Sequence, residues 1–144
     1  MLRIGKMADY ALLITNHLVS SNNQLQTTET LAKATYLPVT TVRKLLKQLV
    51  DAGIVNSYRG IKGGYVLAQN PEVLSVADVV VAIEGPISLT ECSTDKGECN
   101  LRGKCRLKTN WNYLNVVVSN ILKQISLTDM SKKMSGKYNT SIPF

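Results

Sequence analysis

The sequence predicts a mainly α-helical fold with one small β-hairpin and one long helix near its end. Apolar residues recur every three to four positions along most of the chain, which is the period of a helix with one buried face. Two short strand-like runs flank a glycine-rich tip at residues 57–64. A long polar–apolar stretch then occupies residues 106–126. These three features predict a helical head, a hairpin and a long C-terminal helix.

Composition bounds the class of protein. The chain has 144 residues, of which 44% are hydrophobic and 19% charged, as in a globular domain that can bury a core. No apolar run approaches the roughly 18 residues of a membrane span. Residues 10–19 are interrupted by Thr15, Asn16 and His17, so they are interpreted as a helix of the fold rather than a signal peptide. We therefore expect a cytoplasmic protein without membrane association, and three cysteines argue against a disulfide framework.

The positive charge is concentrated in the first half of the chain. Formal net charge is +7. Residues 1–64 hold eight Lys and Arg against three Asp and Glu, a net of +5, whereas residues 65–144 hold nine against seven, a net of +2. A basic N-terminal half indicates a polyanionic partner, with a solvated basic surface as the alternative.

Three helices are expected before the hairpin. Residues 9–20 have one apolar face, and residues 27–36 begin with hydroxyl caps and an acid in the first turn. Pro38 makes a turn directly afterwards, since it fixes its own φ angle and restricts the residue before it. A further helix over residues 39–51 follows at once and is terminated by Gly53.

The helix over residues 39–51 has two different faces. Its expected core stripe is Val39, Val42, Leu46, Leu49 and Val50. Its other side carries Thr40, Thr41, Arg43, Lys44, Lys47 and Gln48. A short helix, a tight turn and a longer helix with a basic, hydroxylic face form a helix-turn-helix arrangement. We expect Thr40, Thr41 and Arg43 to face base edges of double-stranded DNA and Lys44 and Lys47 to face phosphates, although an amphipathic surface helix would show the same pattern.

The hairpin follows this helix directly. Residues 54–55 and 65–67 are strand-like, and the glycines between them permit the positive φ values of a tight tip. Arg59 and Lys62 lie on the hairpin, as expected of a wing that enters a minor groove or contacts phosphates. A phosphate-binding loop is the rival interpretation, but the pattern G-x-x-x-x-G-K-[ST] is missing and no helix follows immediately. Residues 1–85 are therefore predicted to form a winged helix-turn-helix domain.

The second half contains two more helices. Ser75 and Asp78 form a predicted capping box, and the helix after them is stopped by Gly85 and Pro86. In the long stretch, the spacing of a two-helix contact is shown by Trp111, Leu114, Val118, Ile121 and Ile125. A rod of about 20 residues is about 30 Å long and does not fit back onto a small winged domain. Residues 107–128 are therefore predicted to pair with a second copy in a homodimer, with a purely intramolecular role as the alternative.

All three cysteines lie between these helices. Cys92, Cys99 and Cys105 have the spacing C-x6-C-x5-C in a polar, glycine-containing segment. Three clustered thiolates suit an iron–sulfur cluster or a zinc ion. Residues 86–106 are therefore interpreted as a cysteine loop that binds a metal centre. Residues 129–144 are Ser-, Lys- and Met-rich and are predicted to be a disordered tail.

The order of these parts resembles the IscR/NsrR family of bacterial iron–sulfur transcription regulators, often called the Rrf-two family, from Leu2 to about Met130. The resemblance rests on the runs YRG at residues 58–60, GGYVLA at 63–68 and EGP at 84–86, and on the three cysteines. Within the family, the runs LTEC at 89–92, NW at 110–111 and ISLTDM at 125–130 are most similar to regulators of the SUF cluster-assembly operon.

The resemblance implies a homodimeric winged-helix protein in which Cys92, Cys99 and Cys105 hold a 2Fe–2S or 4Fe–4S cluster. Many IscR-type proteins carry a histidine three residues after the third cysteine, where this chain has Lys108, a poor ligand because a protonated amine has no lone pair. NsrR-type proteins complete the site with an aspartate near the N-terminus of the partner subunit, and Asp9 occupies a comparable place. A helix cap or first-turn acid is the alternative for Asp9. Weaker candidates are Glu91, Asp95 and Glu98.

The function expected from these parts is a DNA-binding repressor that senses cluster status, nitric oxide or redox state and controls iron–sulfur assembly genes. An enzyme acting on a small-molecule substrate is not expected, because the sequence offers no nucleophile–base pair and only one histidine. Two alternatives stay open. One is an iron–sulfur electron-transfer protein, and the other is a DNA-binding regulator that uses zinc or thiol redox chemistry instead of a cluster.

Overall fold

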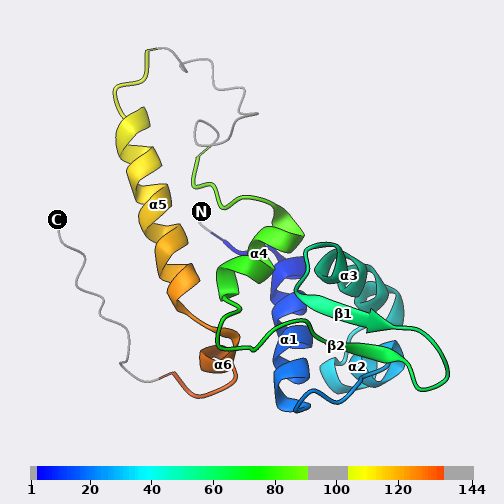
Figure 1. The fold of residues 1–144 in the computed structure, drawn as a ribbon. Coiled ribbons are helices and arrows are strands. Elements are labelled where there is room, and N and C mark those ends of the chain that lie inside the picture. Colours follow the sequence, from blue (N-terminus) through cyan, green and yellow to red (C-terminus); the bar gives the residue numbers. More distant parts are fainter. Residues whose placement is uncertain (1–2, 91–103, 135–144) are drawn as a thin grey trace.

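The computed structural model describes residues 3–90 and 104–134 (Figure 1). It confirms the predicted fold class, a mostly helical protein with one two-stranded antiparallel hairpin. Two parts are visible: a head built from the helices α1–α4 and the hairpin, and the helix α5, which extends away from it (Figure 1). None of the helices in the described part of the chain has the length and apolarity needed to cross a membrane.

Helix α1, Lys6–Ser20, is the centre of the head and packs against α2, α3 and α4. It begins three residues earlier than expected, because Gly5 is extended and serves as its N-cap. Ala11, Ile14 and Leu18 are buried on one face, at the spacing that predicted the helix. The core around this face also contains Leu31, Val42, Leu45, Leu46, Leu49, Ile54, Val55, Leu67, Leu74, Val79 and Leu127.

The helix-turn-helix is formed by α2, Thr28–Thr35, and α3, Val39–Asp51. The Thr27 hydroxyl accepts a hydrogen bond from the Thr30 amide at 3.1 Å and caps α2. The predicted core stripe of α3 needs one correction. Val39 is 36% exposed, whereas Leu45, which the stripe omitted, is fully buried. Leu45 belongs to the same core cluster as Ile14, whereas Val39 does not, so three-dimensional packing shifts the stripe.

The hairpin consists of β1, Val55–Tyr58, and β2, Gly64–Leu67. Its register pairs Val55 with Leu67 and Tyr58 with Gly64. A further bridge attaches β2, at its second residue, to the segment before α2, since the amides of Gln26 and Tyr65 each donate to the other residue's carbonyl, at 2.9 and 2.8 Å. The direction of the hairpin is thereby set relative to the helix-turn-helix.

Helix α4, Val76–Glu84, begins with the predicted capping box. The Asp78 amide donates to the Ser75 hydroxyl at 3.2 Å, and the Ser75 amide donates to the Asp78 carboxylate at 2.7 Å. The helix ends at Gly85, whose φ of 84° is a left-handed value that favours glycine. Both ends therefore follow the local sequence signals.

The long helix is shorter than predicted and is followed by an additional short one. Helix α5, Lys108–Gln124, ends because Ile125 is extended, and Ser126 begins α6, Leu127–Met130, with a second capping box on Asp129. Leu127 is 1% exposed and belongs to the core of the head. The chain that was expected to continue as a rod and then become a disordered tail therefore turns back onto α1, at least as far as residue 130 (Figure 1). Residues 135–144 lie outside the described part.

Three backbone hydrogen bonds hold this return, the longest from the Thr128 amide to the Pro71 carbonyl at 3.3 Å. The Val76 amide donates to the Ile125 carbonyl at 2.9 Å, and the Leu127 amide donates to the Leu74 carbonyl at 2.8 Å. Ile125, expected in the dimer contact, instead packs with Leu122 against the apolar side chains of α1 and α4. The C-terminal end of α5 is thus attached to the head of its own chain.

Candidate nucleic-acid interface and metal-binding segment

The polar face predicted for α3 is solvent-accessible. Thr40, Arg43, Lys44 and Lys47 are exposed, and Thr41 is partly buried. The opposite face of the helix is anchored by the fully buried Leu45, Leu46 and Leu49. Because the buried side fixes the rotation of the helix, its basic and hydroxyl groups are held outward.

The hairpin tip is a tight turn with little freedom. The Gly63 amide donates to the Gly60 carbonyl at 2.9 Å, and Gly60 has a φ of 111°. A side chain at Gly63 would collide with the backbone oxygens of Tyr58 and Gly60. This turn presents Arg59 and Lys62, which are both exposed, away from the head.

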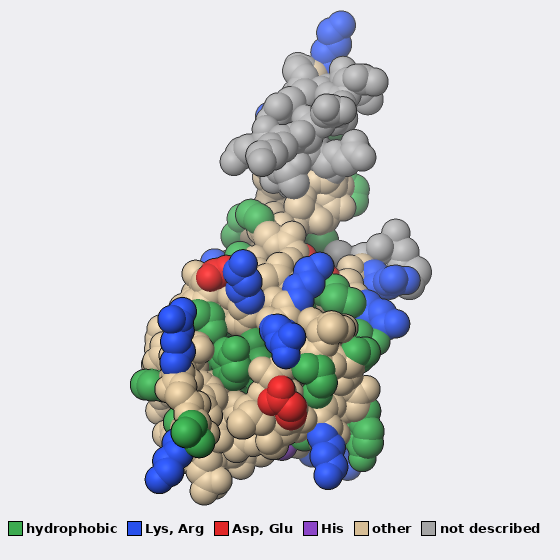
Figure 2. All heavy atoms as spheres, turned by 90° about the vertical axis from the view of Figure 1, so that its right-hand side faces the viewer, with side chains coloured by type: hydrophobic (Ala, Val, Ile, Leu, Met, Phe, Trp, Pro, Cys, Tyr) green, Lys and Arg blue, Asp and Glu red, His purple; other side chains and the backbone are tan. Residues whose placement is uncertain are grey.

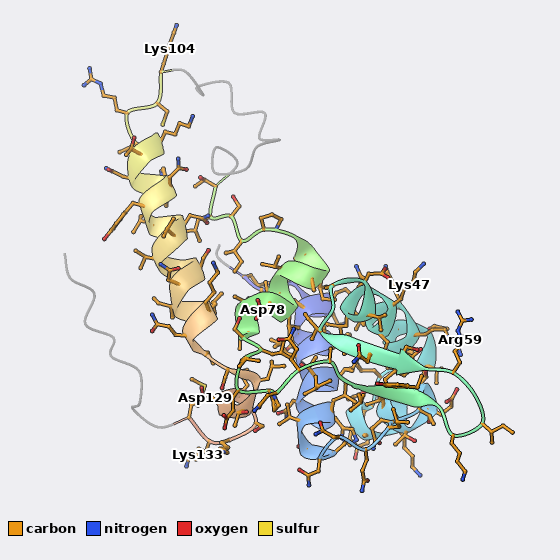
Figure 3. All side chains as sticks on the ribbon, viewed as in Figure 1. Lys47, Arg59, Asp78, Lys104, Asp129 and Lys133 are labelled. Atoms are coloured by element: carbon orange, nitrogen blue, oxygen red, sulfur yellow. The ribbon has the colours of Figure 1, made fainter. Side chains whose placement is uncertain are left out.

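The predicted DNA contacts lie on one side of the molecule. Lys47 on α3 and Arg59 on the hairpin both point outward on the side opposite α5 (Figure 3). On that face most of the charged side chains are Lys and Arg, with few acidic groups between them (Figure 2). A face on which basic side chains outnumber acidic ones suits the phosphate backbone of a duplex.

Apolar side chains on the same elements were not anticipated from the sequence. Ile61 at the hairpin tip is 107% exposed, and Tyr58 on β1 is 54% exposed. Tyr36, in the turn before α3, is 95% exposed and has a left-handed φ of 56°. The exposure of Ile61 could have been predicted from composition, because a β-branched residue in a glycine-containing turn has no core to pack against.

The predicted metal ligands are only partly within the described residues. Cys92 and Cys99 lie outside them, and Cys105 is a half-buried free thiol just before α5. No three His, Cys, Asp or Glu side chains converge within the described ranges. The donor set itself fits a cluster or zinc, because both prefer sulfur ligands. The fit therefore rests on three thiols in one short segment.

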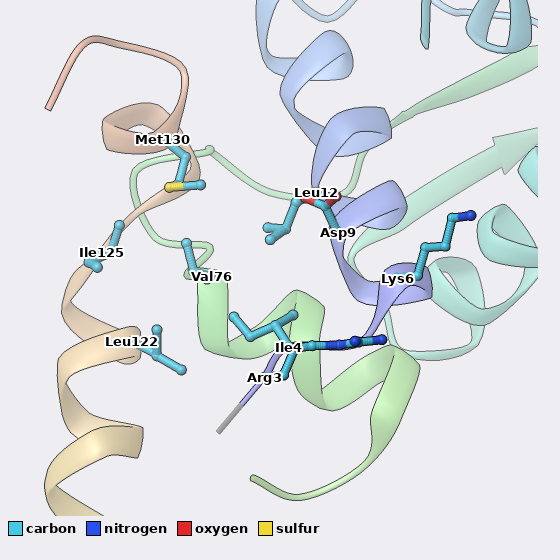
Figure 4. A pocket seen from close by; sticks show the side chains of 9 residues that line it. All are labelled: Arg3, Ile4, Lys6, Asp9, Leu12, Val76, Leu122, Ile125 and Met130. Atoms are coloured by element: carbon cyan, nitrogen blue, oxygen red, sulfur yellow. The ribbon is translucent and has the colours of Figure 1, made fainter. Parts of the chain in front are cut away.

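Asp9 lies in the first turn of α1 and is exposed. The N-cap of α1 is Gly5, so Asp9 does not cap the helix. Of the two structural roles expected for Asp9, only that of a first-turn acid remains. Its carboxylate borders an open groove of about 570 Å³ together with Arg3 and Lys6 (Figure 4). Lys104, next to Cys105, lies at the far end of α5 from the head (Figure 3). The structure of one chain therefore does not bring Asp9 and Cys105 together.

Helix α5 has no buried residue in the single chain. Trp111, Leu114 and Ile121 of the predicted contact are 36%, 44% and 44% exposed. Tyr113 and Val116, which the heptad spacing did not include, are 62% and 54% exposed. The apolar surface of α5 is thus wider than the predicted stripe.

Taken together, the basic recognition helix and the anchored hairpin define a winged helix-turn-helix DNA-binding protein. The family profile Rrf2, described as "Iron-dependent Transcriptional regulator", matches residues 4–133. The chain therefore belongs to the Rrf2 family and is a DNA-binding transcriptional regulator.

Named relatives are regulators and not enzymes. The chain is 26% identical to the HTH-type transcriptional regulator CymR of Bacillus subtilis, over 94% of both proteins. It is 31% identical to IscR of Vibrio campbellii over 91 residues, which are 63% of this chain and 54% of that protein. The chain thus spans about half the length of that IscR relative.

Solved structures show the same fold. The structure of B. subtilis CymR superposes with a TM-score of 0.75 at 25% identity and covers 94% of this chain and 100% of that one. IscR of T. potens superposes with a TM-score of 0.70 at 23% identity and covers 95% of both chains. The second likeness is evidence for the fold alone.

Proposed function

We propose that this regulator binds operator DNA as a homodimer, with α3 in the major groove and the hairpin at the adjacent minor groove or backbone. The observation that carries the proposal is the separation of two surfaces: basic groups on α3 and the hairpin, and uncovered apolar groups on α5 (Figure 3). Thr40, Thr41 and Arg43 would contact base edges, and Lys44 and Lys47 phosphates. Arg59 and Lys62 flank Ile61, a side chain suited to the sugar walls of a minor groove.

Dimerisation would occur through the exposed face of α5. An apolar helix face without cover is stabilised when a second copy removes it from water. Two heads joined this way would present their recognition helices to half-sites about 34 Å apart, one turn of duplex. A regulator of chromosomal genes would act in the cytoplasm.

The cysteine segment is proposed to bind an iron–sulfur cluster through Cys92, Cys99 and Cys105, with Asp9 of the second subunit as a fourth donor. The description of the matched family, which names iron, supports iron over zinc. Such a cluster would supply sensitivity to iron supply, nitric oxide or redox state. Lys108, partly buried at the start of α5, would contribute a positive charge beside the anionic thiolates.

We propose that the protein represses iron–sulfur assembly genes and that the state of the cluster determines whether it binds their operators. A coupling free energy of about 1–3 kcal/mol between the metal site and the DNA site changes operator affinity roughly 5- to 150-fold. That range is sufficient for regulation. The C-terminal attachment of α5 to the head offers a direct mechanical route, because a tilt of α5 changes the distance between two heads.

The DNA-binding part is tested by selecting sequences from a random duplex pool and measuring affinity against salt. We expect a two-fold symmetric site, and log affinity should fall linearly with log salt. Arg43→Ala should relax sequence preference, whereas Lys44→Ala should weaken binding uniformly. Binding that is absent even at low salt would contradict the proposal.

The metal part is tested by anaerobic reconstitution with iron and sulfide. We expect visible absorbance and bound iron, both lost when any of the three cysteines is replaced with Ala. Asp9→Ala tests the fourth donor, since a ligand's loss changes the cluster spectrum and its lifetime in air, whereas the loss of a first-turn acid alone affects only the stability of α1. Glu29→Ala, which removes an exposed first-turn acid from α2, serves as the matched control.

A second candidate function is regulation by zinc or by thiol oxidation without a cluster. It is favoured by the match to B. subtilis CymR, which covers 94% of both chains and whose structure is described as that of the global cysteine regulator. The structure of Staphylococcus aureus CymR is also known in an oxidized form. Reconstituted protein that binds no iron but changes its operator affinity on thiol oxidation would establish this candidate in place of the cluster.

A further inference from the structure

One side chain of α5 is bonded to the chain segment that precedes the cysteines. The Asn115 amide nitrogen Nδ2 donates to the Ile87 carbonyl at 2.8 Å. Its oxygen Oδ1 accepts from the Leu89 amide at 3.0 Å. All three residues are partly buried, so water competes less for these bonds than it would on an open surface.

The two bonds require a carboxamide. Asn115 offers one donor and one acceptor to residues two apart, as the edge of a neighbouring β-strand would. Aspartate has the same shape but lacks the donor, and alanine lacks both groups. The position therefore selects asparagine for its chemistry and not for its volume.

The contact joins α5 to the residues directly before the cysteine segment. Asn115 lies seven residues after Lys108, the first residue of α5, and Leu89 lies three residues before Cys92. The Ser88 hydroxyl also donates to the Thr90 carbonyl at 2.7 Å, which stiffens the last described residues before the cysteines. The chain is therefore bonded to α5 just before the cysteine segment and joins α5 again just after Cys105.

The other end of α5 is held separately. Its C-terminal attachment uses the bonds between Ile125 and Val76 and between Leu127 and Leu74, on the head. Among the described residues, Asn115 thus provides two side-chain hydrogen bonds that tie the half of α5 nearest the cysteines to the segment leaving α4. Without the Asn115 bonds, the segment between α4 and α5 would be held at residue 85, and with them it is held at residue 89. This shortens the loop that leads to α5 only slightly, so the entropy of closing the loop changes little. The contribution of the contact lies in orientation.

We propose that Asn115 is a positioning residue that transmits the state of the cysteine segment to the tilt of α5. The inference rests on the proposed function and names the element that couples its two sites. A change at the thiols pulls on residues 87–89, the carboxamide passes that displacement to α5, and the fixed C-terminal end converts it into a rotation of the head.

The test compares Asn115→Asp and Asn115→Ala with the wild type, and Asn120→Asp as a control at an exposed position of the same helix. The first measurement is hydrogen exchange of the Leu89 amide in the reduced, metal-free protein. Loss of its acceptor should speed that exchange roughly 5- to 100-fold in Asn115→Ala and leave it unchanged in the control. Asn115→Asp keeps the acceptor for the Leu89 amide and removes only the donor to the Ile87 carbonyl, so it separates the two bonds. Unchanged exchange would overturn the contact itself. Circular dichroism shows whether each variant folds. If Asn115→Asp does not fold, the Asn115→Ala variant still provides the test.

The second measurement is the ratio of operator affinities between the iron-loaded and metal-free proteins, or between reduced and oxidised thiols. In the wild type this ratio should lie in the range of about 5 to 150. In the Asn115 variants it should fall towards one, with the metal-free affinity itself unchanged. A ratio equal to that of the wild type, with fast Leu89 exchange, would make Asn115 merely structural. A wild-type ratio of one would instead contradict the proposed sensing, and with it the coupling.

Discussion

The head and α5 differ in how completely the single chain buries them. In the head, α1 and α3 each contribute several fully buried side chains, among them Ile14, Leu45 and Leu49. In α5 no residue is buried, and Leu114, at a predicted contact position, is 44% exposed. The same kind of apolar periodicity thus leads to a core in one region and to an open surface in the other. Periodicity shows that a helix has an apolar face, but not which molecule covers that face.

The contrast also exists along α5 itself. Near its C-terminus, Leu122 and Ile125 are partly buried against α1 and α4. Towards the cysteines, Tyr113 and Val116 are more than half exposed. Helix α5 is therefore packed on the head at its C-terminal end, whereas its other half is held through the Asn115 bonds and keeps exposed apolar side chains.

The largest expected effect is on the head. Leu45→Ala should lower the free energy of unfolding by about 2–5 kcal/mol, since it leaves a cavity in a fully buried site. Urea unfolding of dilute protein measures this effect. Leu114→Ala, the matched change on α5, should cost about 1 kcal/mol or less under the same conditions. Equal losses at both positions would remove the distinction between the two regions.

Association of two chains should depend on α5. Leu114→Asp should weaken dimerisation by about 2 kcal/mol or more, roughly 30-fold in dissociation constant, because it places a charge in an apolar contact. Sedimentation over a range of concentrations measures the constant. Val73→Asp is the control, since Val73 is an apolar residue of the head that is 66% exposed. A greater effect of the Val73 change would move the interface from α5 to the head.

The junction between the regions depends on a capping box. Ser126→Ala should cost about 0.5–2 kcal/mol, since the Asp129 amide loses its acceptor at 3.0 Å and α6 loses its start. Ser75→Ala removes the same motif inside the head and should cost a similar amount. Thermal unfolding of both variants gives the comparison. A negligible effect at Ser126 alone would mean that α6 does not hold α5 in place.

The smallest effect concerns charge. Lys47→Ala should reduce the slope of log DNA affinity against log salt by about 0.9, the value for one lost phosphate contact. Lys123→Ala removes an exposed lysine from α5 and should leave the slope unchanged. Fluorescence anisotropy titrations at several salt concentrations give both slopes. A reduced slope in the Lys123 variant would place DNA contacts on α5 as well.

Much of the head could be predicted because its signals are local. The Thr27 cap, the Pro38 turn and the Ser75 capping box each act within four residues, and the structure places helix starts at all three. The glycines of the hairpin likewise determine the tip by sterics alone. The exposed positions of Arg43, Lys47, Arg59 and Lys62 follow from the same local elements.

The sequence by itself thus determined the helix-turn-helix, the hairpin and the polar face offered to DNA, because short-range capping, turn geometry and periodicity dictate them. Tertiary structure alone decided that α5 ends before Ile125. The helix ends there because Leu127 is buried in the core of the head, which lies far away in the sequence. It also decided that Asn115 reaches back to residues 26 and 28 positions earlier, Leu89 and Ile87. Such contacts join parts that no local period connects, and they attach α5 to the head and to the approach to the cysteines.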